Sequence, residues 1–286
     1  MSVGTLFVVA TPIGNLGDIT LRAIETLKAV PLIAAEDTRH THRLLERHAI
    51  PTRTTSYHAH SGPGRLEALL QHLRDGADLA LVTDAGTPAV SDPGADLVAA
   101  WAAEGGHVVP IPGASAVLAA VVGSAVVGAR WSFEGFLPRS GRERRQRIAR
   151  IAADDRATVV FEGPGRVAAT LRDLAAACGA DRPGAACREL TKIHETFVRG
   201  TLGELAAAAS DGTIPARGEF VLVVGERLAP ADPIAAAAAA DDALSIARAE
   251  VARLIASGVA RGDAARQVAA ASGLARRALY AAGTLD

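Results

Sequence analysis

The sequence predicts an α/β protein with two α/β domains and a small all-α extension, and three observations lead to this prediction. Short apolar runs alternate with segments of helical hydrophobic spacing along most of the chain. The 286 residues exceed the usual size of one domain. After Arg227 the composition shifts to alanine and proline before amphipathic segments resume. We therefore expect α/β domains over residues 1–112 and 113–228, a linker over 229–242 and a helical extension over 243–286.

The first domain is expected to hold a mostly parallel sheet with helices on its faces. Its apolar runs are short, as in buried strands, and they cover residues 6–10, 31–35, 77–82 and 107–111. Between them, helical patterns cover residues 19–30, 38–47, 64–74 and 94–103. Alternation of strand and helix is typical of a sheet whose connections cross over its faces.

A second α/β pattern follows in the middle of the chain. Residues 114–129 are weakly polar but shorter than the roughly 20 residues of a membrane span, so we expect a buried helix and turn there. An arginine-rich segment over 131–153 interrupts the alternation, which then resumes. Strand patterns cover residues 157–161, 184–188, 194–199 and 219–224, and helical patterns cover 165–177 and 202–209.

The C-terminal extension has the pattern of three short helices separated by glycine turns. We expect these helices over residues 244–256, 264–271 and 276–281, with Asp263 as the N-cap of the second. Such an arrangement is similar to a helix-turn-helix.

Composition narrows the class of protein. The 30 basic and 31 acidic residues give a net charge of −1, which by itself argues neither for nor against a nucleic-acid partner. Cys178 and Cys187 are too few for a disulfide framework, and we expect them reduced and buried. No basic segment precedes an apolar run at the N-terminus, so we expect no signal peptide and a cytoplasmic protein.

Four polar loops follow the expected strands of the first domain, over residues 11–18, 36–39, 83–88 and 112–115. Ligands of open parallel sheets bind beyond the carboxyl ends of the strands. A tight turn explains the glycines and prolines of any one loop, but four such loops at one edge predict a small-molecule site. Neither a Gly-x-Gly-x-x-Gly nor a P-loop motif occurs, which disfavours NAD and nucleoside triphosphates.

Eight motifs resemble those of the tetrapyrrole methylase superfamily, in its branch that methylates ribosomal RNA. They are VATPIGNLGD (9–18), AAEDTRHT (34–41), TDAGTP (83–88), SDPG (91–94), PGAS (112–115), EGFLP (134–138), RELTK (188–192) and GEFVLV (218–223). The resemblance implies a cleft for S-adenosylmethionine between two α/β domains. It also implies 2′-O-methylation of a cytidine in the decoding region of small-subunit ribosomal RNA, with the RNA or the subunit as partner, and a homodimer.

The resemblance further implies which residues bind the methyl donor. They are Pro12, Asp84, Ala85, Gly86, Thr87, Pro88, Ser115, Ala116, Phe161, Glu162 and Leu190. The chain departs from the family pattern at residues 163–166, where Gly-Pro-Gly-Arg replaces an expected Ser-Thr-His-Arg-like turn. This departure retains Arg166 but puts the other contacts of the turn in question.

Methyl transfer to a ribose requires alignment and a route for the proton. The sulfonium donor is already electrophilic, so orientation supplies much of the rate. A 2′-hydroxyl is a poor nucleophile at neutral pH and needs a base or a nearby cation. The matched loops offer the catalytic candidates Glu36, Asp37, Lys192 and Glu195. Asp37 is equally suited to cap the following helix, so the sequence leaves the choice of base open.

An arginine cluster predicts contact with the RNA backbone, since guanidinium groups match phosphate geometry. The expected RNA-binding residues are Arg39, Arg139, Arg142, Arg144, Arg145 and Arg147. A solvated helix face is the other interpretation of this charge run.

Histidines cluster at positions 40, 42, 48, 58 and 60, but a third metal ligand at fixed spacing is missing. We therefore expect no metal.

The sequence leaves two other functions open. A precorrin-type methyltransferase would share the fold and the donor, and the arginines could hold its acidic macrocycle. A non-enzymatic regulator would read nucleic acid with its helical extension and sense a metabolite with its α/β body.

Overall fold

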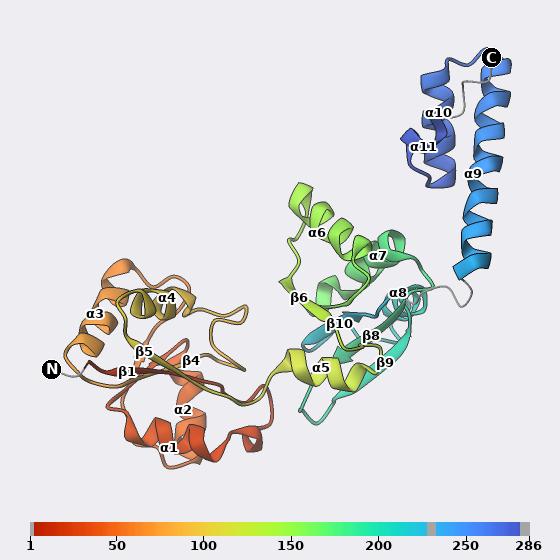
Figure 1. Cartoon of the computed structure of the whole chain (residues 1–286). Helices are drawn as coiled ribbons and strands as arrows, with labels where there is room; N and C mark the ends of the chain where they lie inside the picture. Colours follow the sequence, from red (N-terminus) through yellow and green to blue (C-terminus); the bar gives the residue numbers. More distant parts are fainter. Residues whose placement is uncertain (1–2, 228–232, 281–286) are drawn as a thin grey trace. The chain divides into compact units, whose positions relative to one another are not determined.

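The computed structural model describes residues 3–227 and 233–280, and the chain divides after Arg227 into two compact units (Figure 1). The first unit contains both α/β domains. The second contains the helical extension.

The first domain holds the expected parallel sheet. Its strands are β1 (Thr5–Val9), β2 (Leu32–Ala35), β3 (Thr54–Ser56), β4 (Leu79–Val82) and β5 (His107–Ile111), in the order β3-β2-β4-β1-β5. All four neighbouring pairs are parallel. The sequence pattern misses β3, because its three residues are polar and half-buried and form no apolar run.

Helices cover both faces of this sheet (Figure 1). They are α1 (Leu21–Ala29), α2 (Thr38–Arg47), α3 (Pro63–Arg74) and α4 (Ala95–Ala103). Leu27 of α1 and Leu45 of α2 pack on one face in one core cluster. Leu73 of α3 and Trp101 of α4 belong to the cluster on the other face. This arrangement leaves the carboxyl ends of the strands free to present loops.

The second sheet is mixed, although its strands also alternate with helices. Its strands are β6 (Trp131–Phe136), β7 (Ala157–Glu162), β8 (Pro183–Arg188), β9 (Thr196–Thr201) and β10 (Phe220–Val224), in the order β6-β7-β10-β8-β9. Only β6 and β7 pair in parallel; the other three pairs are antiparallel.

Four helices pack on the second sheet. They are α5 (Ala116–Ser124), α6 (Gly141–Ala153), α7 (Val167–Cys178) and α8 (Leu202–Ser210). Buried residues of α6, α7 and α8 share one core cluster, and those of α5 belong to the other. Residues 131–153 therefore do not interrupt the fold. They supply strand β6 and helix α6, whose charged surface hides a regular pattern.

Helix α5 is buried on one side only, which corrects the prediction of a buried helix. Val117 and Ala120 belong to the core, whereas Leu118 is 54% exposed and Val122 is 82% exposed. The cysteines are free as expected; Cys187 is buried and Cys178 half-buried. None of the described helices is long and apolar enough to cross a membrane.

The second unit contains α9 (Pro233–Ala256), α10 (Arg261–Ser272) and α11 (Arg276–Tyr280), which pack around Val251, Val268 and Leu279. Helix α9 starts at Pro233, ten residues before the expected start of the helical extension at position 243, because the alanine run is helical. Residues 228–232 lie outside the described structure. Ala260 is the N-cap of α10. The predicted cap, Asp263, instead pairs with Arg266 at 3.0 Å.

Candidate active site

Two cavities lie where loops of the first domain meet the second. The larger, about 490 Å³, is lined by the loops after β1 and β4, by α2, and by Lys192 and Glu219. The smaller, about 360 Å³, is lined by residues 85–87, 90–92, 115–117, 161–164 and 219–221, together with Ile13 and Phe136. Both cavities therefore draw on the polar loops that the sequence placed at the edge of the first sheet.

Most of the expected donor-binding residues gather at the smaller cavity. Those that line it are Ala85, Gly86, Thr87, Ser115, Ala116, Phe161 and Glu162. Pro12 and Asp84 line the larger cavity. Pro88 is buried and lines neither, and Leu190 packs in the core below the site.

The loop after β4 is fixed against the loop after β1. The N–H of Thr11 donates to the carbonyl of Gly86 at 2.8 Å, and the N–H of Gly86 donates back at 3.1 Å. The Thr11 hydroxyl donates to the carbonyl of Thr83 at 3.0 Å. Gly86 has a φ of +79°, which a residue with a side chain rarely adopts. These bonds place the Gly86 backbone on the wall of the smaller cavity.

Three carboxylates from separate loops approach one another beside the cavities. Glu36 accepts from the N–H of Asp84 at 3.3 Å, and Asp84 accepts from the N–H of Asp37 at 3.1 Å. Burial raises the pKa of Asp92 to about 7, and the negative charges of Glu36 and Asp84 add to the effect. Asp92 lines the smaller cavity and was missing from the sequence-based site, although it belongs to one of the matched motifs.

Asp37 acts as the cap of α2. Its carboxylate accepts from the N–H of Arg39 at 2.9 Å and pairs with the Arg39 guanidinium at 2.7 Å. Arg39 holds the pKa of Asp37 well below its usual range. A carboxylate with this pKa is a weak proton acceptor, and neither Glu36 nor Asp37 lines either of the two cavities described above.

Lys192 extends from the second domain into the larger cavity. Its ammonium pairs with Glu189 at 2.9 Å and with Glu219 at 3.0 Å. Partial burial lowers the pKa of Lys192, but the two carboxylates raise it by more, so it lies above its ordinary value. Lys192 is therefore a cation rather than a base. Glu195 accepts from the N–H of Thr191 at 2.7 Å and supports this turn.

The carboxylate of Glu162 is bound by three residues of the second domain. Its buried carboxylate accepts from the Thr170 hydroxyl at 2.6 Å and from the Gly163 N–H at 2.9 Å, and it pairs with Arg166 at 3.0 Å. Arg166, in the turn over residues 163–166, is thus in contact with Glu162.

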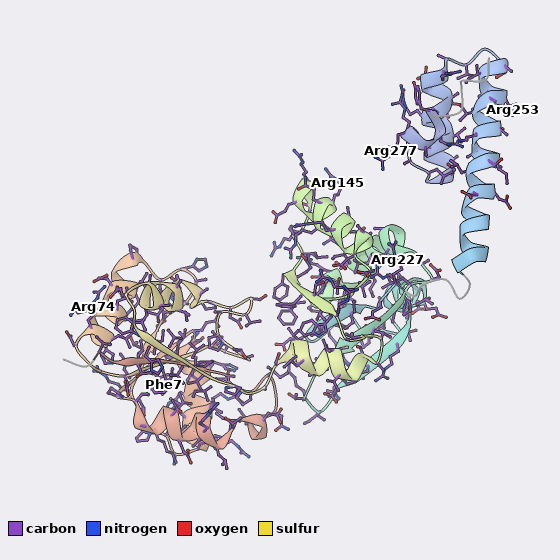
Figure 2. The ribbon with its side chains drawn as sticks, in the orientation of Figure 1. Phe7, Arg74, Arg145, Arg227, Arg253 and Arg277 are labelled. Atoms are coloured by element: carbon purple, nitrogen blue, oxygen red, sulfur yellow. The ribbon has the colours of Figure 1, made fainter. Side chains whose placement is uncertain are left out.

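The arginine cluster of α6 divides into two groups. Arg144 is 8% exposed and pairs with Asp173 at 2.7 Å, and Arg147 pairs with Glu134 at 2.9 Å. The sequence predicted that both arginines bind RNA. In the structure their side chains instead hold α6 in place, so they are not available to RNA. Arg139, Arg142 and Arg145 are exposed, and their side chains make no hydrogen bond or ion pair with any residue that the structure describes. Figure 2 shows Arg145 projecting from α6.

Among the described residues, no group of three histidine, cysteine, aspartate or glutamate side chains is arranged to hold a metal ion. His58 and His60 form an edge-to-face ring pair, with centroids 6.3 Å apart.

Comparison with known proteins places this chain in a family. The model of the tetrapyrrole (corrin/porphyrin) methylases matches residues 5–206. A Synechocystis protein named ribosomal RNA small subunit methyltransferase I is 46% identical over 97% of this chain and 96% of its own length. The protein of that name from Halalkalibacterium halodurans is 42% identical, over 97% and 93%.

A solved structure supports the fold. Uroporphyrin-III C-methyltransferase from Thermus thermophilus, complexed with S-adenosylhomocysteine, is 21% identical with a TM-score of 0.56, and the match covers 78% of this chain and 97% of that one. Together with the matched residues, these findings show that the chain belongs to the tetrapyrrole methylase family, alongside the relatives named ribosomal RNA small subunit methyltransferase I.

Proposed function

We propose that this protein transfers a methyl group from S-adenosylmethionine to small-subunit ribosomal RNA, at the 2′-hydroxyl of a cytidine in the decoding region. The observation that carries the proposal is a pair of adjoining cavities, one suited to the donor and one open to a larger acceptor. Relatives that match over nearly the whole chain bear a name with the same reaction class and RNA substrate.

The donor is assigned to the smaller cavity. Phe136 and Phe161 offer aromatic edges to an adenine, with ring centroids 5.5 Å apart. Ser115, which also lines this cavity, can hydrogen-bond the ribose or the amino-acid moiety. The bound donor supplies an electrophilic methyl group, and the protein aligns it with the acceptor.

The acceptor ribose is assigned to the larger cavity. Its polar wall includes His40, Asp84 and the cation of Lys192, which would stabilise negative charge developing on the 2′-oxygen. Glu36 and Asp37 support this wall through backbone hydrogen bonds and act indirectly.

The RNA backbone is assigned to Arg142 and Arg145 of α6 and to Arg139 just before it, which are exposed, since free guanidinium groups bind phosphates. Arg39 is 90% exposed, and its pairing with Asp37 leaves part of its guanidinium free for a phosphate. We place the reaction in the cytoplasm, where ribosomal subunits are found.

The assembly is proposed to be a homodimer. Leu118 and Val122 lie one helical turn apart on α5 and form an apolar face at the surface, which a second copy would bury.

Tritium-labelled S-adenosylmethionine tests the proposal directly. The protein is incubated with either small ribosomal subunits from a strain lacking this gene or a precorrin-type macrocycle. Label in the RNA that survives alkaline hydrolysis as a 2′-O-methyl dinucleotide supports the proposal. Label in the macrocycle alone would overturn it.

A further inference from the structure

The two cavities share part of their walls, and this junction defines where a methyl group can pass between them. Among the described residues, Ile13, Ala85 and Glu219 line both cavities. In-line transfer requires the sulfonium and the attacking oxygen to meet within about 3–3.5 Å, so the reacting atoms must lie at the junction.

Only one of these three side chains can receive a proton. Ile13 is apolar and 8% exposed, and Ala85 has a methyl side chain. Glu219 carries a carboxylate, and its side chain is 76% exposed. A base must stand within hydrogen-bond reach of the hydroxyl it deprotonates, and Glu219 has the position to do so.

The carboxylate of Glu219 is held by a short chain of charged contacts. Lys192 bonds to Glu219 at 3.0 Å and to Glu189 at 2.9 Å. Glu189 closes the chain by accepting from the N–H of Glu219 at 2.9 Å, while the N–H of Glu189 donates to the carbonyl of Glu219 at 3.0 Å. The side chain at the junction therefore has a defined direction.

Two glycines make room for this chain of contacts. Gly218 has a φ of +83°, and a Cβ there would stand 2.7 Å from the Glu189 carboxyl carbon. A Cβ at Gly14 would collide with the stem of Lys192. Local strain points the same way, since Glu189 and Thr191 both adopt a positive φ, of 52° and 65°.

From this geometry we propose that Glu219 is the catalytic base of the transfer, with Lys192 and Glu189 as the residues that position it. The inference rests on the proposed function. As the 2′-oxygen bonds to the methyl carbon, the carbon–sulfur bond breaks and its electron pair stays on sulfur, which gives S-adenosylhomocysteine. The hydroxyl proton passes to the Glu219 carboxylate and from there to water.

The other acidic residues fit this role less well. Asp37 is the cap of α2 and is bound to Arg39. Asp92 lines the smaller cavity only, on the side of the donor. Asp84 lines the larger cavity only, and its carboxylate accepts from the N–H of Asp37.

The test compares Glu219→Gln with Glu46→Gln, which removes the same charge from an exposed site on α2 outside both cavities. Single-turnover methylation of small ribosomal subunits is measured with saturating donor. We expect Glu219→Gln to lower the rate by about 10²- to 10⁴-fold. Its affinity for S-adenosylhomocysteine, measured by calorimetry, should stay within about threefold of wild type, and Glu46→Gln should match wild type in both.

A pH profile separates a base from a merely structural residue. Without the carboxylate, hydroxide must remove the proton, so the residual rate of Glu219→Gln should rise about tenfold per pH unit near neutrality, more steeply than that of wild type. A Glu219→Gln rate within threefold of wild type, or a lowered rate with an unchanged pH profile, would overturn the inference. A wild type that does not label the subunits would instead overturn the proposed function.

Discussion

The carboxylates around the two cavities differ in how their charges are compensated. Asp37 has Arg39 beside it and Glu219 has Lys192, whereas Asp92 has no hydrogen bond or ion pair with a described residue. Burial and the charges of Glu36 and Asp84 raise the pKa of Asp92 from 3.8 to about 7. Its ionisation should therefore be coupled to folding.

The Asp92→Asn variant should show this coupling in its pH dependence. Because the folded pKa is raised, protonated Asp92 contributes stability that is fully present below about 3.8 and lost as the pH rises through about 7. At pH 8 the asparagine variant should exceed wild type by about 1–2 kcal/mol, after a discount for the partial exposure of the loop.

Urea unfolding at pH 4.5 and at pH 8 measures this difference. An equal difference in free energy of unfolding at the two values would contradict the assignment of the raised pKa to Asp92.

At the scale of elements, α6 combines two arginine roles that single substitutions can separate. Arg144→Ala removes the bonds to Asp173 and Thr170 from a nearly buried site, so we expect a loss of about 2 kcal/mol of stability. Arg142→Ala, at an exposed position, should change stability by less than about 0.5 kcal/mol.

The variant at the exposed position, Arg142→Ala, also tests RNA binding. Arg142→Ala should weaken RNA binding and lower its salt slope by about 1 if one phosphate contact is lost. Thermal unfolding and binding titrations at several salt concentrations test both variants. Unchanged RNA affinity in Arg142→Ala and in the matching Arg145→Ala would contradict the assignment of the RNA surface to α6.

The exposed face of α5 makes a second prediction at this scale. Val122→Glu should convert the proposed dimer into a monomer, because burying a carboxylate in an apolar interface costs several kcal/mol. Light scattering after size exclusion gives the mass. Glu25→Gln, at an exposed site on α1, is the control and should leave the mass unchanged; a dimeric Val122→Glu protein would place the interface elsewhere.

Hydrophobic periodicity predicted most of the elements, but it missed β6 and α6 and did not show how the second sheet is assembled. The pattern of alternating strands and helices suits both domains, yet β10 lies between β7 and β8 and runs antiparallel to each. Pairing direction depends on the path of the connections, which periodicity does not record. Strand β3 was invisible because Thr54–Ser56 has no apolar residue.

The candidate site was predictable in part. The glycine-rich loops could be grouped because parallel strands end at one sheet edge. Glu219 could not be singled out, since its place beside Ile13 and Ala85 comes from the meeting of two domains far apart in sequence. The burial of Arg144 could not be predicted either. A run of charged residues predicts an exposed helix and does not show which face of that helix packs inward.

At the scale of the whole molecule, the two compact units predict separable functions. A protein ending at Arg227 retains both cavities and should bind S-adenosylhomocysteine within about twofold of the full chain. Its affinity for small ribosomal subunits should fall, because it loses the exposed Arg261 and Arg277. Calorimetry and filter binding provide the two readouts. Loss of S-adenosylhomocysteine binding by a folded truncated protein would contradict this division.

A nucleotide-resolution map of 2′-O-methylation on small-subunit ribosomal RNA, from cells with and without this gene, tests the proposed reaction in the cell. One cytidine in the decoding region should lose its methyl group in the deletion strain. The purified wild-type protein should restore that group, and Glu219→Gln should restore it far more slowly. Identical maps from the two strains would contradict the proposed methylation of this RNA.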